Sequence, residues 1–324
     1  MRRLPLLFLA AVLVPAPAEA ARLPGPLVAL AAGPGTAYAV VATRSRTAPF
    51  RVLRSGGRRV TALGAFGSRA ARFADVAAGP AGPVTVFGRP ASSGFAYLSS
   101  DGVQLGEGTG PPVLTVAGDA RHVSYPDEDG NVAVGEYGSV RTLSGDGPLV
   151  RHSPIDALDG AAGPLVLDVA QSARRTELRV IGPGGPRDAV AATRGRGEIE
   201  ATIARDDTHL FVAYRIGNRL TLAAARATLG ARWSRKRLRV KGDLNGAPAI
   251  ARVGLRTFVA SSQRRSIYLT TAGPSGTFTD RLTRPRGSDL APLAASGPDG
   301  RVYVAWTRRT NGSKRRTAVL RRVL

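Results

Sequence analysis

Seven copies of one short apolar motif run through the chain at nearly even spacing. Each copy is the second of two apolar runs joined by a turn, and the later copies nearly coincide, as in HLFVAY from His209, RTFVAS from Arg256 and RVYVAW from Arg301. The aligned positions are Ala39, Thr85, Ser124, Leu167, Phe211, Phe258 and Tyr303. Their spacings of 46, 39, 43, 44, 47 and 45 residues are typical of four-stranded propeller blades.

The rest of each unit also reads as short strands. Apolar or alternating runs are bounded by Gly, Pro, Ser and Asp, and the chain contains 39 glycines and 23 prolines. Residues 220–229 are the best candidate for a helix, but their place in the repeat predicts a third strand. The sequence predicts an all-β fold: a seven-bladed β-propeller of four-stranded antiparallel blades in one domain, residues 21–324. The blades are expected to begin near residues 27, 72, 111, 153, 198, 246 and 290.

The seventh unit ends before a fourth strand, which predicts how the ring closes. We expect the missing strand to come from residues 22–27, with Pro24 and Pro26 on an outer edge where one side of the strand is unpaired. Closure of this kind removes exposed strand edges.

The first 20 residues have the pattern of a signal peptide. Arg2 and Arg3 precede an apolar run over residues 4–14, and Ala18-Glu19-Ala20 forms a small-x-small cleavage site. The run is too short to span a membrane. We therefore expect a secreted or extracytoplasmic protein that begins near Ala21 and has no membrane span.

Composition excludes several chemistries and favours one class of partner. The chain has no cysteine, which excludes disulfides, thiol nucleophiles and cysteine zinc sites. Its net charge is +23, and the leader holds two arginines and one glutamate, so the remainder carries +22. Such a charge attracts polyanions. GC-rich coding also explains part of the arginine excess, because the only lysines are Lys236, Lys241 and Lys314.

Two later units resemble a known group of propellers. Residues 247–261 (APAIARVGLRTFVAS) and 291–306 (APLAASGPDGRVYVAW) are similar to blade openings of secreted bacterial β-propellers loosely related to the sialidase and BNR-repeat superfamily. Members of that group carry an Asp box, S-x-D-x-G-x-T-W, of which only degenerate forms occur here, such as Ser99-Ser100-Asp101-Gly102 and Gly230 with Trp233. The resemblance implies the fold, and it implies no activity.

Basic residues are concentrated in the loops that join second to third strands, on the face where propellers usually bind ligands. We expect an anionic ligand to be bound there by Arg264, Arg265, Arg308, Arg309, Lys314, Arg315 and Arg316. The opposite face is also basic, so solvated loops are the alternative interpretation. Its basic residues are Arg58, Arg59, Arg187, Arg232, Arg235, Lys236 and Arg237.

Three acidic residues stand at corresponding positions of the innermost strands. Asp75, Asp156 and Glu200 are the candidates for catalysis if the protein is an enzyme. Acids beside the central channel suit a cation site, a general acid and base pair, or a network that joins the blades through arginines. We favour the structural network.

These observations favour a noncatalytic propeller that binds an anionic glycan or surface polymer. The alternative is a sialidase-like glycoside hydrolase at the channel mouth, which by resemblance requires an arginine cluster and a Tyr and Glu pair. Nucleic acid is disfavoured by export and by the lack of aromatic residues in the basic loops. No cofactor or metal site is expected. Asp127 and Asp129 imitate a calcium loop, but position 138 is glycine where a bidentate Glu is needed.

Overall fold

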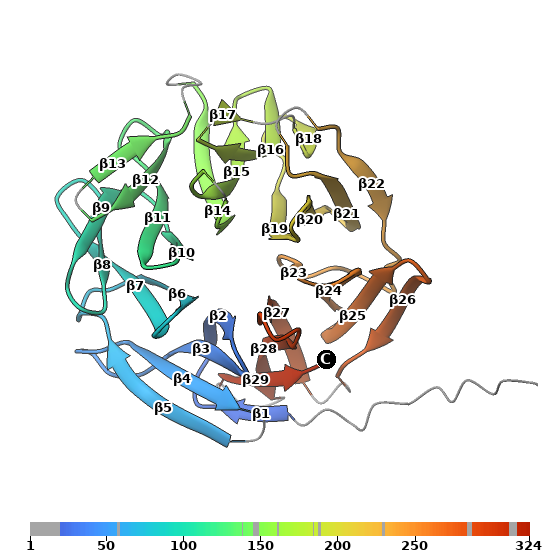
Figure 1. Cartoon of the computed structure of the whole chain (residues 1–324), viewed down its shortest axis with the longest axis horizontal. Coiled ribbons are helices and arrows are strands. Elements are labelled where there is room, and N and C mark those ends of the chain that lie inside the picture. The colour runs from blue at the N-terminus through green and yellow to red at the C-terminus, as the bar shows by residue number, and fades with distance from the viewer. Residues whose placement is uncertain are drawn as a thin grey trace, which may run out of the picture.

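The computed structural model describes residues 20–324 except 57–58, 138, 145–148, 161, 184, 187–188, 229–230, 284–286 and 311–315. Of the predicted leader, only Ala20 is among the described residues. Four basic residues of the predicted faces also lie outside them: Arg58, Arg187, Lys314 and Arg315. The described elements are all strands, and they form seven sheets arranged in a ring around a central channel (Figure 1). The predicted seven-bladed, all-β propeller is confirmed. No helix among the described residues is long and apolar enough to cross a membrane.

Each blade is an antiparallel sheet whose strands follow one another in chain order from the channel outward. Blade 1 contains β2 (Leu27–Gly33), β3 (Thr36–Ala42), β4 (Phe50–Gly56) and β5 (Arg59–Phe66). Blade 2 contains β6 (Phe73–Gly79), β7 (Gly82–Pro90), β8 (Phe95–Ser99) and β9 (Gln104–Gly108). Blade 3 contains β10 (Val113–Ala117), β11 (Ala120–Pro126), β12 (Val132–Glu136) and β13 (Ser139–Thr142).

Blade 4 departs from this plan only at its outer edge, where two short strands share one neighbour. It contains β14 (Arg151–Leu158), β15 (Leu165–Gln171) and β16 (Arg175–Gly182), and β16 pairs with both β17 (Gly185–Pro186) and β18 (Ala191–Arg194). Blade 5 contains β19 (Ile199–Arg205), β20 (His209–Ile216), β21 (Arg219–Arg226) and β22 (Ser234–Arg237). Residues 220–226 of the candidate helix at 220–229 therefore belong to a third strand, as the repeat predicts, and Leu229 lies outside the described residues.

The last two blades complete the ring. Blade 6 contains β23 (Ala249–Val253), β24 (Arg256–Gln263), β25 (Ser266–Gly273) and β26 (Gly276–Arg281). Blade 7 contains β27 (Gly287–Ser296), β28 (Val302–Thr310), β29 (Arg316–Arg322) and, as its outer strand, β1 (Ala20–Leu23). The innermost strands thus begin at residues 27, 73, 113, 151, 199, 249 and 287.

The N-terminal segment closes the ring, but with different residues from those expected. β1 pairs antiparallel with β29, from Ala20 opposite Arg321 to Leu23 opposite Ala318. The predicted strand over residues 22–27 is wrong in its bounds, because the chain turns away after Leu23. Gly25 has a φ of +117°, in the region that favours glycine, and the N–H of Ala42 donates to the carbonyl of Pro26 at 3.0 Å. The two prolines therefore lie in the link to blade 1 and not in an edge strand.

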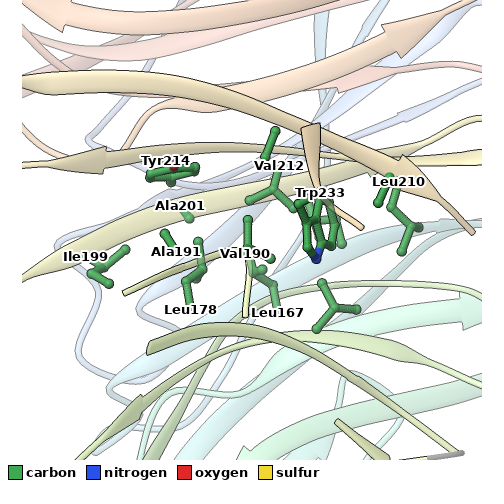
Figure 2. Packing of buried hydrophobic residues seen from close by; sticks show 14 of the residues in the cluster. Leu167, Leu178, Val190, Ala191, Ile199, Ala201, Leu210, Val212, Tyr214 and Trp233 are labelled. Atoms are coloured by element: carbon green, nitrogen blue, oxygen red, sulfur yellow. The ribbon is translucent and has the colours of Figure 1, made fainter. Parts of the chain in front are cut away.

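The core consists of apolar layers between neighbouring blades. The largest cluster lies between blades 4 and 5, where Leu167 and Leu178 of blade 4 pack near Val212 and Tyr214 of blade 5 (Figure 2). Small residues such as Ala201 let the innermost strands approach one another. Because each sheet is buried on both faces by its neighbours, alternation of apolar and polar residues is weak in the second strands.

Leu23 anchors the closing strand in the cluster between blades 7 and 1, where it is 1% exposed. We predict that Leu23→Ala lowers the free energy of unfolding by about 2–5 kcal/mol, because it removes buried methyl groups and leaves a cavity. Urea unfolding measures this. Leu255→Ala, at a side chain that is 70% exposed, is the control and should behave as the unmodified protein does. Equal midpoints for both variants would contradict the role of β1 in closure.

Candidate functional site

The antiparallel order gives the ring two faces. Successive strands run in opposite directions, so the loop that enters each blade and the loop between its second and third strands lie on one side, here called the top face. The turns between first and second strands and between third and fourth strands lie on the bottom face. The β24–β25 turn at Arg264-Arg265 therefore belongs to the top face, and Arg256 at the start of β24 belongs to the bottom face.

A cavity of about 430 Å³ occupies the central channel, and the first strand of every blade contributes to its wall. Two carboxylates line it, Asp75 from blade 2 and Asp156 from blade 4. Its other lining residues are Val28, Ala29, Leu30, Ala74, Pro111, Pro112, Val113, Pro154, Ile155, Thr202, Ile203, Ala249, Ile250, Leu293 and Ala294.

Each channel carboxylate bonds to the next blade in the same way. Asp75 accepts the backbone N–H of Leu114 in blade 3 at 2.8 Å, and Asp156 accepts that of Ile203 in blade 5 at 2.9 Å. The second oxygen of each accepts the N–H of the following residue in its own strand. The two acids therefore join neighbouring blades, but through backbone groups and not through the arginines that the sequence suggested.

Burial changes the acidity of both groups. It raises the pKa of Asp75 from 3.8 to about 6, against the opposing effect of the two hydrogen bonds. Burial likewise raises the pKa of Asp156 to about 7, and the nearby charge of Asp75 adds to the shift. The channel therefore holds two acids that take up protons near neutral pH.

Glu200 does not join them. The residue beside Asp156 in blade 5 is Ile203, three positions further along β19. Three residues of a strand span about 10 Å, so Glu200 lies nearer the top face. There it pairs with Arg215, whose Nε donates to Oε2 at 2.5 Å. The alignment of Glu200 with Asp156 was therefore wrong.

The cavity also lacks the other groups that a sialidase-like mechanism would require. No arginine and no tyrosine is among the residues that line it. The described residues therefore do not assemble an arginine cluster and a Tyr and Glu pair around the two channel acids. Nor do the described residues contain a group of three or more His, Asp or Glu side chains that could hold a metal ion.

Many of the few acidic residues elsewhere are paired with arginines, in several cases across blades. Asp101 of blade 2 lies 2.5 Å from Arg121 of blade 3, and Asp206 of blade 5 lies 3.1 Å from Arg252 of blade 6. The guanidinium of Arg121 and a hydrogen bond from Ser99 keep the pKa of Asp101 below its ordinary value. These pairs neutralise particular arginines and leave others without an acidic partner.

The turn between β24 and β25 presents two adjacent arginines in an unusual conformation. Gln263 pairs with Ser266, so Arg264 and Arg265 form a two-residue hairpin turn, with φ of 45° and 68°. Both angles positive define a type I′ turn, which favours Asn-Gly. The surroundings hold the turn in place: Gln263 is fully buried, and the N–H of Arg264 donates to the carbonyl of Asp243 at 3.1 Å. Both arginines are exposed.

Asp289 connects this turn to blade 7. Its backbone N–H donates to the carbonyl of Arg265 at 3.1 Å, and its carbonyl accepts the hydroxyl of Ser262 at 2.8 Å. Its buried carboxylate accepts two hydrogen bonds from Arg308, at 2.7 and 3.0 Å. Arg308, a predicted ligand-binding residue, is thus held in a bidentate ion pair that raises its pKa further.

Two more of the predicted ligand-binding arginines lie next to this ion pair. Arg309 of β28 and Arg316 of β29 are exposed and stand directly opposite each other in the sheet. Like charges in that arrangement are destabilising unless an anion offsets them. Among the described residues, the side chains of Arg264, Arg265, Arg309 and Arg316 make no ion pair or hydrogen bond. We call these four residues the arginine patch.

Sequence reasoning missed two buried acids, Asp289 beside the arginine patch and Asp168 in blade 4. Asp289 was not singled out, because its innermost strand begins earlier than the repeat predicts and contains an irregular step between Leu290 and Leu293. Asp168 lies 2.7 Å from Nδ1 of His152, with both side chains fully buried. An aspartate inside the apolar run PLVLDVA was a usable signal for a buried ion pair.

No known family model matches this sequence, and no curated protein sequence does. Solved structures do match in fold. A propeller of Dos1 shares 8% identity with a TM-score of 0.57, over 94% of this chain and 95% of that one. The sialidase of Trypanosoma rangeli, bound to the inhibitor DANA, shares 12% identity with a TM-score of 0.51, over 94% of this chain and 58% of that one.

A prolyl endopeptidase structure shares 12% identity with a TM-score of 0.54, over 90% of this chain. This chain covers 45% of the endopeptidase and 58% of the sialidase, about half of each. At such identities the likeness shows the fold alone. The chain is a seven-bladed β-propeller, and sialidases are among the proteins whose fold it resembles.

The channel acids predict a pH dependence of stability. Because the pKa of Asp75 and Asp156 is raised above 3.8, their contribution is fully present below about pH 4 and is lost as the pH rises through about 6 and 7. Urea midpoints should fall across this range, and less steeply for the double variant Asp75→Asn and Asp156→Asn. Asp101→Asn is the control. The pKa of Asp101 is lowered, so this carboxyl group changes its protonation only below about pH 4, and the fall across pH 6 to 7 should remain in this variant. If the urea midpoint falls equally with pH in the double variant and in the unmodified protein, the two channel acids are not the source of the pH dependence.

The strained turn predicts a gain in stability. A non-glycine residue in the left-handed region costs about 1–2 kcal/mol, which Asn and Gly largely avoid. We predict that the double variant Arg264→Asn and Arg265→Gly raises the free energy of unfolding by about 1–2 kcal/mol in urea titrations. An unchanged or lower free energy of unfolding would show that the two arginines do not destabilise the turn.

Proposed function

We propose that this protein is a secreted, noncatalytic propeller that binds an anionic extracellular glycan or surface polymer through the top face of blades 6 and 7. The observation that carries the proposal is the arginine patch: four exposed cations without acidic partners, on two blades fastened together by Asp289. Guanidinium groups bind carboxylates and sulfates well because their planar fork matches two oxygens at once.

Backbone strain and like-charge contact support a ligand at this position. The protein retains two left-handed arginines in one turn and two facing arginines in the adjacent sheet, and both features lower stability when no anion is present. Codon composition explains why arginine is common in the chain. It does not explain why arginine occupies positions where it is unfavourable.

The hydrolase alternative has less support. Two acids with raised pKa in one cavity are what general acid catalysis requires. However, both are held by backbone N–H groups of neighbouring blades, and the described residues that line their cavity include no arginine or tyrosine. We therefore favour binding over catalysis. We favour export over a cytoplasmic location because the leader pattern ends at Ala20, the first residue of β1.

Binding by the arginine patch is tested with heparin as the polyanion. Arg264, Arg265 and Arg309 are replaced together by Ser, and the control replaces Arg59, Arg226 and Arg256, three exposed bottom-face arginines that also lack ion pairs among the described residues. We expect the top-face variant to bind roughly tenfold or more weakly than the control variant, because charge-assisted contacts are lost.

The measurement is repeated at two salt concentrations, because screening acts over about 8 Å near 0.15 M salt. Affinity of the unmodified protein should fall steeply as salt rises. Equal losses for the two triple variants would mean that net charge alone attracts the polyanion, and the proposed binding face would be withdrawn.

A further inference from the structure

A second hollow lies at the seam where the ring closes. Its volume is about 750 Å³, and it shares no lining residue with the channel cavity. It is bounded by the link from β1 to β2, by the end of β3 and start of β4, and by the start of β29. The lining residues are Pro24, Gly25, Pro26, Ala42, Thr43, Arg44, Arg51, Arg316 and Thr317.

Three arginines reach this hollow from distant parts of the chain. Arg44 follows β3, Arg51 is the second residue of β4, and Arg316 is the first residue of β29. All three are exposed, and among the described residues none of their side chains makes an ion pair or a hydrogen bond. No acidic residue is among the described residues that line the hollow. These lining residues therefore give it a positive charge that they do not neutralise.

The walls are built by ring closure and are fixed before any ligand arrives. A side chain at position 25 would place its Cβ 2.2 Å from the carbonyl oxygen of Ala42, so only glycine allows the link to lie this close to β3. The N–H of Leu27 donates to the hydroxyl of Thr307 in blade 7 at 3.1 Å, which ties the same link to the last blade.

The loop that carries Arg44 is also held. The hydroxyl of Thr43 donates to the carbonyl of Ala48 at 3.0 Å and accepts the N–H of Ser45 at 3.1 Å. The backbone N–H of Thr43 donates to the carbonyl of Pro49 at 2.7 Å. A preformed site of this kind loses less entropy on binding than a mobile loop does.

We propose that this hollow binds one uronate residue of an acidic polysaccharide, with the guanidinium groups of Arg44, Arg51 and Arg316 around its carboxylate. The inference rests on the proposed function and specifies the ligand. The volume is within the usual range of about 300–1,000 Å³ for ligand sites. Pro24, Pro26 and Ala42 offer an apolar surface for the face of a sugar ring, and Thr317 adds a polar side chain beside it.

Position and composition distinguish this hollow from other sites. Its residues come from the end of the second strand and the start of the third strand of blade 1, from the start of the third strand of blade 7 and from the link between β1 and β2, and none of them lines the channel cavity where the two buried acids lie. Its described lining contains no aromatic side chain, so a nucleotide base would find no stacking partner there. The cations of this described lining are three arginines, which favour a planar, two-oxygen anion.

The test measures binding of trigalacturonate, an unsulfated oligouronate, by calorimetry to the full chain. Arg51→Ser is compared with Arg54→Ser, an equally exposed arginine three residues further along β4 that does not line the hollow. We expect Arg51→Ser and Arg44→Ser each to weaken binding about tenfold or more, and Arg54→Ser to leave it unchanged. Maltotriose, the neutral counterpart, should not bind.

Several outcomes would overturn the inference. Equal affinities of Arg51→Ser and Arg54→Ser for trigalacturonate would remove the hollow as the site. Competition by inorganic sulfate at the same concentration as the oligouronate would show that charge alone is recognised and not a sugar. If trigalacturonate fails to bind while heparin binding still depends on Arg264, Arg265 and Arg309, the hollow is wrong and the proposed function stands. If heparin also fails to bind, both are wrong.

Discussion

The pairing of β1 with β29 is the interaction on which the rest of the structure depends. It supplies the fourth strand of blade 7 and places Leu23 in the core between blades 7 and 1. It also removes the exposed edge that an open ring would leave. The link that follows this strand then forms one wall of the hollow at the seam. The same contact therefore stabilises the fold and shapes a candidate binding site.

The distribution of acids explains how a strongly basic chain can present free cations. The two channel acids accept backbone hydrogen bonds, and Asp168 is buried against His152. Several others form ion pairs with arginines that are fixed within or between blades, as Asp289 does with Arg308. Because acids are few and many are engaged internally, exposed arginines remain without acidic partners on both faces, among them the arginine patch on the top face, and an external anion becomes the available counter-charge.

The fold could be predicted from the sequence because the second strand of each blade contains the repeated motif. These strands are buried by the neighbouring blades and therefore keep an apolar sequence. The site could be predicted only in part. The innermost strands of blades 1, 4 and 7 contain irregular steps. Such bulges shift the pairing register of the strand, and amino-acid composition does not reveal them. Asp289 was missed for this reason. Blade 5 pairs without such a step, and Glu200 was misplaced by its alignment with Asp156, which lies directly after the step in blade 4. Arg44 and Arg51 were not linked to Arg316, because only ring closure brings the two ends of the chain together.

Amide hydrogen exchange with and without heparin shows whether anions bind one face of the ring. We expect added protection at the top-face segments around residues 43–51, 263–266 and 288–289, and none at the bottom-face turns around residues 34–35, 206–208 and 254–256. Protection spread equally over both faces, or confined to the bottom-face turns, would contradict it.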